Sequence, residues 1–246
     1  MNLLVLMAGN STNFEGMGYP YPKYLMEIDG LPLIQHVVRR LTEIDNVKPI
    51  FCIRHEHDRR FHLGDVLRLL VPDSEVIAIE GETKGAACTA LLAVEHINND
   101  EPLIITNGDQ IVDVNHQRFI DEFEKKNMDG GIVVFESVHP RWSFVRLDES
   151  DHVIETAEKR PLSKNATAGM YYFKKGSDFV SSAMSMIEVG NDLNGLYYVC
   201  PVYNEMVLNH AQIGVFRIDK KDYHSLATPQ DVERYGHIYE QKESII

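Results

Sequence analysis

Short apolar runs alternate with amphipathic segments of helical length through the first half of the chain, and this alternation restricts the folds open to it. The runs at residues 3–7, 50–53 and 103–106 lack polar alternation. Strands with this pattern are covered on both faces, as in parallel sheets. Together with the helical segments between them, they predict βαβ units.

The second half, from about Gly131, has more consecutive strand-like runs and fewer helices, so a mixed sheet is expected there. The expected strands span residues 3–7, 50–53, 76–79, 103–106, 131–135, 169–173 and 214–218. The expected helices span residues 31–43, 57–70, 85–97, 116–126, 201–209 and 228–240. The chain has no long linker, repeat or low-complexity tract. Residues 1–246 therefore predict a single α/β domain with a mixed, mostly parallel central sheet flanked by helices.

Charge and cysteine content exclude several kinds of partner. A formal net charge of −13 would repel nucleic acid, so any phosphate site must be a local cluster of cations and backbone N–H groups. The 3 cysteines are widely spaced and lack metal-ligand spacing, which argues against zinc and favours reduced thiols in a cytoplasmic protein. The first apolar run is too short for a signal peptide or a membrane span, so no membrane is expected as a partner. The oligomeric state stays open, a homo-oligomer included.

The first expected strand runs into a turn of small and polar residues, Met7-Ala8-Gly9-Asn10-Ser11-Thr12-Asn13-Phe14, and Pro22-Lys23 follows. Ligands of open α/β sheets bind beyond the carboxyl ends of the strands. Backbone N–H groups of such a turn approach phosphate oxygens closely, and a nearby lysine adds a point charge. An ordinary strand-to-helix turn explains the same residues equally well. The turn is neither a Rossmann fingerprint nor a Walker loop.

The buried run at residues 103–106 ends in Asn107-Gly108-Asp109. This places a carboxylate at the carboxyl edge of the sheet. Mg²⁺ typically takes one or two carboxylates plus substrate phosphate oxygens, so the position suits a magnesium ligand. A helix cap is the alternative explanation for an Asp after a strand.

A third motif, Glu82-Thr83-Lys84-Gly85-Ala86-Ala87, is a turn that leads into a helix of small residues. Such a turn lets a flat ring lie against the backbone. Close packing of the helix on the sheet is an equally good reason for the small residues.

Taken in order, these motifs resemble the sugar-phosphate nucleotidyltransferase family. The order is the first turn, Gly85-Ala86-Ala87, Gly108-Asp109, Glu158-Lys159-Arg160-Pro161 and Ala227-Thr228-Pro229. The resemblance runs from about residue 3 to about residue 235, and it is strongest to small bacterial proteins of capsule and surface-polysaccharide synthesis. It implies a Rossmann-like, glycosyltransferase-A-like domain. About residues 1–130 would bind the nucleotide and about residues 131–246 the acceptor.

The resemblance also implies a reaction and its residues. A nucleoside monophosphate passes from a nucleoside triphosphate to a phosphorylated small molecule, with a sugar 1-phosphate as the expected acceptor and Mg²⁺ held by Asp109. The implied catalytic residues are Lys23, Asp109 and Lys159. The implied nucleotide-binding residues are Met7, Ala8, Gly9, Asn10, Ser11, Thr12, Asn13, Lys23, Thr83, Gly85, Ala86, Asn107 and Gly108. The acceptor-binding candidates are Glu158, Lys159, Asn165 and Gly169, joined by Trp142 as a stacking platform and Ser143 beside it.

Three positions depart from the family pattern. Ser11 replaces a loop glycine, and Asn13 replaces an arginine that stabilises the triphosphate. Ser225 stands where the family commonly has a second metal-binding Asp. Asp222, or Asp219 near it, is the candidate to replace that ligand.

Other functions compete with this one. A cytidylyltransferase acting on a non-sugar phosphate fits the same motifs. A glycosyltransferase usually binds its metal through Asp-x-Asp, a pattern that Asp109-Gln110-Ile111 breaks. A non-catalytic sensor of nucleotides or sugar nucleotides would explain the replaced residues.

Overall fold

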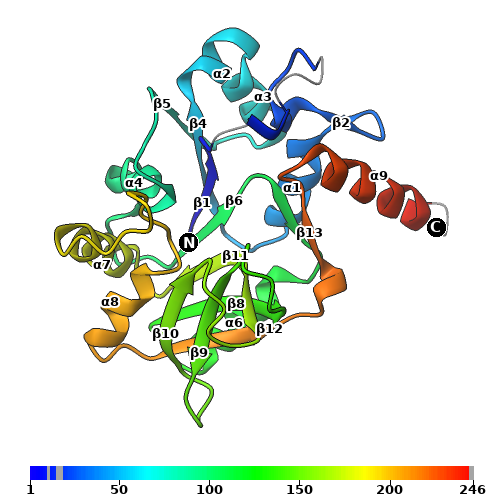
Figure 1. Ribbon diagram of the computed structural model, residues 1–246. Coiled ribbons are helices and arrows are strands. Elements are labelled where there is room, and N and C mark those ends of the chain that lie inside the picture. The colour runs from blue at the N-terminus through cyan, green and yellow to red at the C-terminus, as the bar shows by residue number, and fades with distance from the viewer. Residues whose placement is uncertain (10–11, 15–18, 244–246) are drawn as a thin grey trace.

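The computed structural model describes residues 1–9, 12–14 and 19–243 and is built around a nine-stranded sheet (Figure 1). The strand order is β10-β9-β11-β6-β1-β4-β5, while β8 also pairs with β11 and β12 pairs with β8. The strands are β1 (Asn2–Met7), β4 (Lys48–Arg54), β5 (Glu75–Ile79), β6 (Leu103–Asn107), β8 (Gly130–Glu136), β9 (Ser143–Leu147), β10 (Val153–Glu158), β11 (Asn165–Phe173) and β12 (Ile213–Arg217).

Most of these strands run in one direction. β1 lies parallel to β4 and β6, β4 is parallel to β5, and β12 is parallel to β8. β11 is antiparallel to β6, β8 and β9, and β10 is antiparallel to β9. Within this sheet, β10 and β11 therefore oppose the other strands, which confirms the predicted mixed, mostly parallel sheet.

Both faces of the sheet are covered. Leu3, Val5 and Met7 of β1 belong to one hydrophobic cluster, and Leu4 and Leu6 belong to another on the opposite face. The first cluster includes residues of α1 (Leu33–Leu41), α3 (Leu63–Leu70), α6 (His116–Lys125) and α9 (Pro229–Glu243). The second includes residues of α4 (Ala86–Leu91), α5 (Val94–Ile97), α7 (Gly176–Glu188) and α8 (Val202–Leu208). Figure 1 shows α4, α7 and α8 grouped on one side of the molecule and α1 and α9 on the other.

Two small ladders lie outside the main sheet. β2 (Glu27–Ile28) pairs with β3 (Leu31–Pro32), so α1 begins two residues later than its expected start. β7 (Gln110–Val112) pairs antiparallel with β13 (Tyr223–Ser225). This second ladder brings a segment from near the end of the chain beside the residues that follow β6.

Two expected helices are each divided in two. The helix expected at residues 57–70 is α2 (His55–Phe61) followed by α3, because His62 adopts the left-handed conformation with φ of 56°. The Asp58 carboxylate accepts a hydrogen bond from the Gly64 amide (2.9 Å), which stabilises the start of α3. The helix expected at residues 85–97 is α4 followed by α5, with Leu92 and Ala93 between them.

The elements of the second half that were not predicted are α7, β9, β10, the 3-10 helix η3 (Lys220–Asp222) and the short strand β13. In addition, β11 starts at Asn165 rather than at residue 169. A bulge between Thr167 and Tyr171 interrupts its pairing with β8, and Gly169 within it has a φ of 62°.

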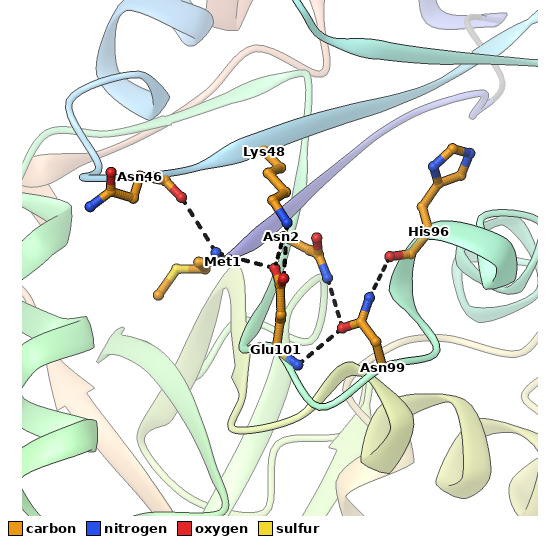
Figure 2. A network of polar contacts seen from close by, with 7 residues as sticks. All are labelled: Met1, Asn2, Asn46, Lys48, His96, Asn99 and Glu101. Atoms are coloured by element: carbon orange, nitrogen blue, oxygen red, sulfur yellow. Dashed lines mark hydrogen bonds and ion pairs between the residues drawn. The ribbon is translucent and has the colours of Figure 1, made fainter.

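The amino ends of β1, β4 and β6 meet in a polar network (Figure 2). The Asn2 side-chain amide donates to Asn99 Oδ1 (3.1 Å), and the Asn99 amide donates to the His96 carbonyl (2.8 Å). The Glu101 carboxylate accepts from Lys48 Nζ at 2.9 Å. This network lies at the amino ends of the three strands, opposite to the carboxyl ends where the predicted nucleotide-binding residues lie.

Candidate active site

A cavity of about 430 Å³ opens at the carboxyl ends of β1, β4 and β6. Of the residues expected to bind nucleotide or metal, its lining contains Ala8, Gly9, Lys23, Thr83, Gly85, Ala86, Asn107 and Asp109. The lining also contains Leu6, Tyr24, Arg54, Glu82, Thr89, Leu196 and Tyr198. Residues from six separate parts of the chain therefore surround one space.

An ion pair between Lys23 and Asp109 lines this cavity. Lys23 begins the short 3-10 helix η2 (Lys23–Leu25), and its Nζ donates to Asp109 Oδ2 at 2.6 Å. The side chains are 5% and 22% exposed, so the lysine is buried while the carboxylate keeps an open face. Burial lowers the pKa of Lys23, but the adjacent Tyr24 hydroxyl and Asp109 carboxylate outweigh it and the pKa lies above the ordinary value. Lys23 is therefore a fixed positive charge.

The turn after β1 is open toward the cavity at Gly9. A Cβ built on Gly9 would have no heavy atom of the described residues within 4 Å, so the backbone there is open on the described side. Asn10 and Ser11 lie outside the described residues. Thr12 begins the 3-10 helix η1 (Thr12–Phe14). Asn13 is exposed and donates to the Ala227 carbonyl (3.3 Å), so its amide is directed to the segment before α9.

The end of β6 is packed tightly against β1. The Gly108 amide donates to the Leu6 carbonyl (3.0 Å), and a Cβ on Gly108 would lie 2.5 Å from Met7 Cγ. The Met7 side chain is fully buried. Met7 and Gly108 therefore pack against each other and are not among the described lining residues of the cavity, whereas Asn107 and Asp109 are.

The turn expected to contact the base is fixed by a distant segment. The Ala87 amide donates to the Tyr197 carbonyl (3.0 Å), and the Tyr197 amide donates to the Lys84 carbonyl (2.8 Å). Gly85 has a φ of 103°, and a Cβ there would lie 2.3 Å from the Tyr197 carbonyl oxygen. The hydroxyls of Thr83 and Thr89 are 2.6 Å apart under the same turn. A glycine is thus required at position 85 by both backbone conformation and space.

A second cavity of about 330 Å³ adjoins the first and contains Glu158 and Lys159. Leu196 and Tyr198 line both cavities, and Lys159 Nζ donates to the Tyr198 hydroxyl at 3.1 Å. The expected nucleotide and acceptor residues therefore share one continuous wall.

Glu158 is held at the edge of this second cavity. The Ser143 hydroxyl donates a short hydrogen bond to its carboxylate, and the two residues face each other in the β9–β10 ladder. Burial raises the pKa of Glu158, and the Ser143 hydrogen bond and the Lys159 charge offset this only partly.

Trp142 and Asn165 occupy other places than the two cavities. The Trp142 ring packs edge-on against Phe135 and Tyr223, with centroids 5.3 Å away in each case, and lines a separate hollow beside α9. Asn165 pairs with Val145 of β9 and Glu136 of β8. Among the described residues that line the two cavities, neither residue occurs.

Gly169 lies where β11 passes the end of β6. The Gln110 amide donates to the Gly169 carbonyl (2.9 Å) and to the Ala168 carbonyl (2.8 Å). A Cβ on Gly169 would lie 2.5 Å from Gln110 Oε1 and 3.0 Å from Asn107 Nδ2. Gly169 therefore allows β11 to approach Asn107 closely.

Ser225 is the last residue of β13, and Asp222 directly precedes that strand. Ser225 pairs with Gln110, and the adjacent Leu226 amide donates to the Asp109 carbonyl (2.8 Å). Asp222 instead lies beside Asp113, whose amide donates to the Asp222 carbonyl (2.7 Å). Three residues of extended chain span about 10 Å, so the structure brings Ser225 rather than Asp222 next to the Asp109 backbone.

Mg²⁺ would depend on its substrate for most of its ligands here. Within the described ranges, no group of three or more His, Cys, Asp or Glu side chains could hold a metal ion. The partly open Asp109 carboxylate at a cavity edge fits an ion that takes one or two carboxylates and completes its shell with phosphate and water oxygens.

Two cavity residues escaped the sequence interpretation in different ways. Arg54 directly follows the expected strand at residues 50–53, so the rule that ligands meet at the carboxyl ends of strands would have identified it. Tyr198 lies in an aromatic-rich segment that suits a hydrophobic core as well as a cleft, so the sequence does not single it out. It lines the cavity, whereas Tyr203 is the buried one and donates to the Gly131 and Tyr172 carbonyls.

In the part of the chain that the structure describes, no helix has both the length and the apolar character needed to span a membrane.

Comparisons with known proteins agree on one family. The family model described as "Nucleotidyl transferase" matches residues 3–194. A bifunctional protein GlmU from Methanocaldococcus jannaschii is 26% identical over 180 residues, which are 71% of this chain and 40% of that protein. The chain thus spans less than half of that relative. The UTP--glucose-1-phosphate uridylyltransferase AglF of Haloferax volcanii is 24% identical over 225 residues, covering 89% of this chain and 88% of that protein.

A solved structure supports the fold. The nucleoside-diphosphate-sugar pyrophosphorylase from Vibrio cholerae RC9 superimposes with a TM-score of 0.83 at 24% identity, covering 96% of this chain and 100% of that one. The predicted fold class is therefore confirmed.

Proposed function

The chain belongs to the nucleotidyl transferase family, and we propose that it transfers a nucleoside monophosphate from a nucleoside triphosphate to a sugar 1-phosphate, releasing pyrophosphate. About residues 1–130 would hold the nucleotide and about residues 131–246 the acceptor. The proposed product is a precursor for the synthesis of capsule or surface polysaccharide. Nucleoside triphosphates are cytoplasmic metabolites, which supports a cytoplasmic location.

The observation that carries this proposal is the contact between Lys23 Nζ and Asp109 Oδ2 at 2.6 Å, inside a cavity that also includes Gly9. A buried cation, a carboxylate and an open glycine turn are the parts that a polyphosphate and a divalent ion require. The sugar phosphate as acceptor is supported by the relative from Haloferax volcanii, which is described as a glucose-1-phosphate uridylyltransferase and has nearly the same length.

In the proposed reaction, a phosphate oxygen of the acceptor attacks the α-phosphorus of the triphosphate. A bond forms between that oxygen and the α-phosphorus, and the bond from the α-phosphorus to the bridging oxygen breaks. The electron pair leaves with pyrophosphate. The attacking oxygen is already ionised at neutral pH, so no general base is needed. Catalysis then consists of positioning and of stabilising negative charge.

Each residue has a proposed task in this step. Lys23 neutralises negative phosphate oxygens at the reacting centre. Asp109 is the residue that would hold Mg²⁺, which when bound would offset charge on the phosphates. Glu158 accepts hydrogen bonds from acceptor hydroxyls, and Lys159 neutralises the acceptor phosphate. Tyr198, shared by both cavities, separates the nucleotide from the sugar.

A pyrophosphate-release screen tests the proposal. Five nucleoside triphosphates (ATP, CTP, GTP, UTP and dTTP) are crossed with a panel of sugar 1-phosphates and alcohol phosphates in the presence of Mg²⁺. We expect release with at least one pair, and a loss of roughly 100-fold or more in Asp109→Ala, since it lacks an electrostatic group at the reacting centre. Asp121→Ala removes an exposed carboxylate from α6 and should retain full activity.

Two results would count against the proposal. One is silence of the wild-type protein with every pair. The other is full activity of Asp109→Ala. Release of a nucleoside diphosphate from UDP-sugars, with no pyrophosphate formed from triphosphates, would indicate a glycosyltransferase instead.

A further inference from the structure

Arg54 is a cavity residue to which the proposed reaction has so far given no task. It ends β4, the strand that lies parallel to β1, and its side chain is 21% exposed. Its Nε donates to the Ala8 carbonyl at 3.1 Å, so the guanidinium lies against the turn after β1. Arg54 and Gly9 line the same cavity as Lys23 and Asp109.

The charge balance of the cavity leaves Arg54 available to a ligand. Among the described residues of the lining, Lys23 and Arg54 are the cations. Lys23 is engaged by Asp109 at 2.6 Å. Arg54 has a much weaker partner, because Glu82 is 3.6 Å away and its side chain is 75% exposed. An exposed ion pair of this kind contributes little and is readily exchanged for a multiply charged anion.

Among the described residues, the contacts of the Arg54 guanidinium leave some of its donors for a ligand. The Ala8 carbonyl uses Nε, while a guanidinium has five N–H donors in a planar fork that matches phosphate oxygens. The turn at Gly85 and Ala86, by contrast, presents backbone and small neutral side chains to the cavity, which suits a neutral ring. A permanent charge beside the first turn is therefore better matched to phosphate than to a base.

The order of the strands indicates which phosphates Arg54 meets. Asp109 follows β6. In the sheet, β11 of the proposed acceptor half lies on one side of β6, and β4 lies beyond β1 on the other side. In phosphoryl transfer, the attacking and leaving oxygens lie roughly in line on opposite sides of the phosphorus. An acceptor arriving from the β11 side therefore directs the leaving pyrophosphate toward β4.

From this arrangement we propose that Arg54 binds the β- and γ-phosphates of the triphosphate and holds the pyrophosphate as it leaves. The inference rests on the proposed function, because it takes the triphosphate as the ligand of this cavity. Asn13 is neutral and hydrogen-bonds to the Ala227 carbonyl, so it supplies no positive charge to the triphosphate. Arg54 of β4 would supply that charge.

Binding measurements on the 246-residue chain distinguish phosphate binding by Arg54 from a purely structural role. The five triphosphates and their monophosphates are titrated by calorimetry with Mg²⁺ present, and the pair with the tightest wild-type triphosphate binding is used. We expect Arg54→Ala to weaken triphosphate binding by roughly 10- to 100-fold, the range for losing hydrogen bonds to a charged group. Monophosphate binding should change by less than about threefold, because the β- and γ-phosphates are absent.

Two further variants sharpen the comparison. Arg54→Lys keeps the charge and loses the fork, so its triphosphate affinity should fall between those of the wild type and Arg54→Ala. Arg68→Ala is the matched control, since Arg68 lies on α3 and pairs with Asp65 away from the cavity. It should bind both nucleotides like the wild type.

The outcomes distinguish failure of this inference from failure of the proposed function. Equal weakening of triphosphate and monophosphate in Arg54→Ala would show that Arg54 only maintains the turn at Ala8, and it would overturn the inference alone. Unchanged triphosphate binding in Arg54→Ala would do the same. A wild-type protein that binds none of the triphosphates would overturn both.

Discussion

Glu158 is a carboxyl group whose surroundings oppose its ionisation. It sits beside the second cavity, burial raises its pKa, and the Ser143 hydroxyl and the Lys159 ammonium compensate only partly. The proposed acceptor contact requires the ionised form, because a carboxylate accepts hydrogen bonds from sugar hydroxyls at both oxygens. As the pH falls, acceptor binding should therefore begin to weaken at a higher pH than it would if the pKa of Glu158 were that of an ordinary glutamate.

The pH dependence of the acceptor KM tests this expectation. As the pH falls from about 8 to about 5, the ionised fraction of a group with a raised pKa decreases, approaching tenfold per pH unit below the pKa. We expect the acceptor KM to rise accordingly while the KM for the triphosphate changes little. Glu158→Gln should bind the acceptor more weakly at pH 8 and have a flatter profile. The slope left in this variant reports the acceptor's own phosphate. Identical profiles for the two proteins would refute a role for Glu158 ionisation.

At the scale of single elements, α7 depends on a glycine at its first position. The Gly176 amide donates to the Glu101 carbonyl (2.9 Å), and a Cβ there would lie 1.9 Å from the Ile97 carbonyl oxygen. The helix then buries Phe179, Ala183 and Met186 against the sheet. The close approach of two backbones sets where α7 begins.

Gly176→Ala should therefore destabilise the protein although alanine is the better helix former. Alanine would force backbone displacement at Ile97, and overpacking of this kind costs about 1–3 kcal/mol. Urea denaturation gives the change in the free energy of unfolding. Gly236→Ala in α9 is the matched control, because the nearest atom to its Cβ is 3.8 Å away, and it should be neutral or stabilising by up to about 1 kcal/mol. Equal stability of the two variants would contradict the steric explanation.

At the scale of the whole molecule, the two ends of the sheet have different tasks. The cavity occupies the carboxyl ends of β1, β4 and β6, and the polar network of Figure 2 occupies their amino ends. Six residues of β1 separate the two, a distance of about 17 Å. Asn99 is central to the network, since it accepts from Asn2 and from the Glu101 amide and donates to His96.

Asn99→Ala should consequently lower stability and leave turnover unchanged. Asn2 is 3% exposed, so its side-chain amide would be left buried without this acceptor, at a cost of about 1–3 kcal/mol. The measurements are urea denaturation and kcat/KM per folded molecule. Asp100→Ala removes a neighbouring exposed ion pair with Lys175 and should change stability by less than about 1 kcal/mol. A large loss of turnover in folded Asn99→Ala would show that the two ends are coupled.

Much of the first half was predictable because its signals are local. The apolar runs of β1, β4, β5 and β6 are continuous in sequence. Ligands of open α/β sheets bind beyond the carboxyl ends of the strands, and this rule predicts Lys23 and Asp109 at one edge of the sheet. The helices and strands of the second half were harder to predict from the sequence. α7 begins with Gly-Ser-Asp, a loop-like sequence, and β9 and β10 are short strands that pair with each other at the edge of the sheet.

By itself, the sequence determined which residue types occur at strand ends and in what order, because hydrophobic periodicity and turn chemistry act over a few neighbouring residues. Only the tertiary structure shows that the Tyr197 backbone hydrogen-bonds to the turn around Gly85 and that Tyr198 lines both cavities. The same is true of Trp142, which lines a separate hollow. These relations depend on which strands pair and how closely backbones pack. Such contacts join residues far apart in the chain, and no local pattern encodes them.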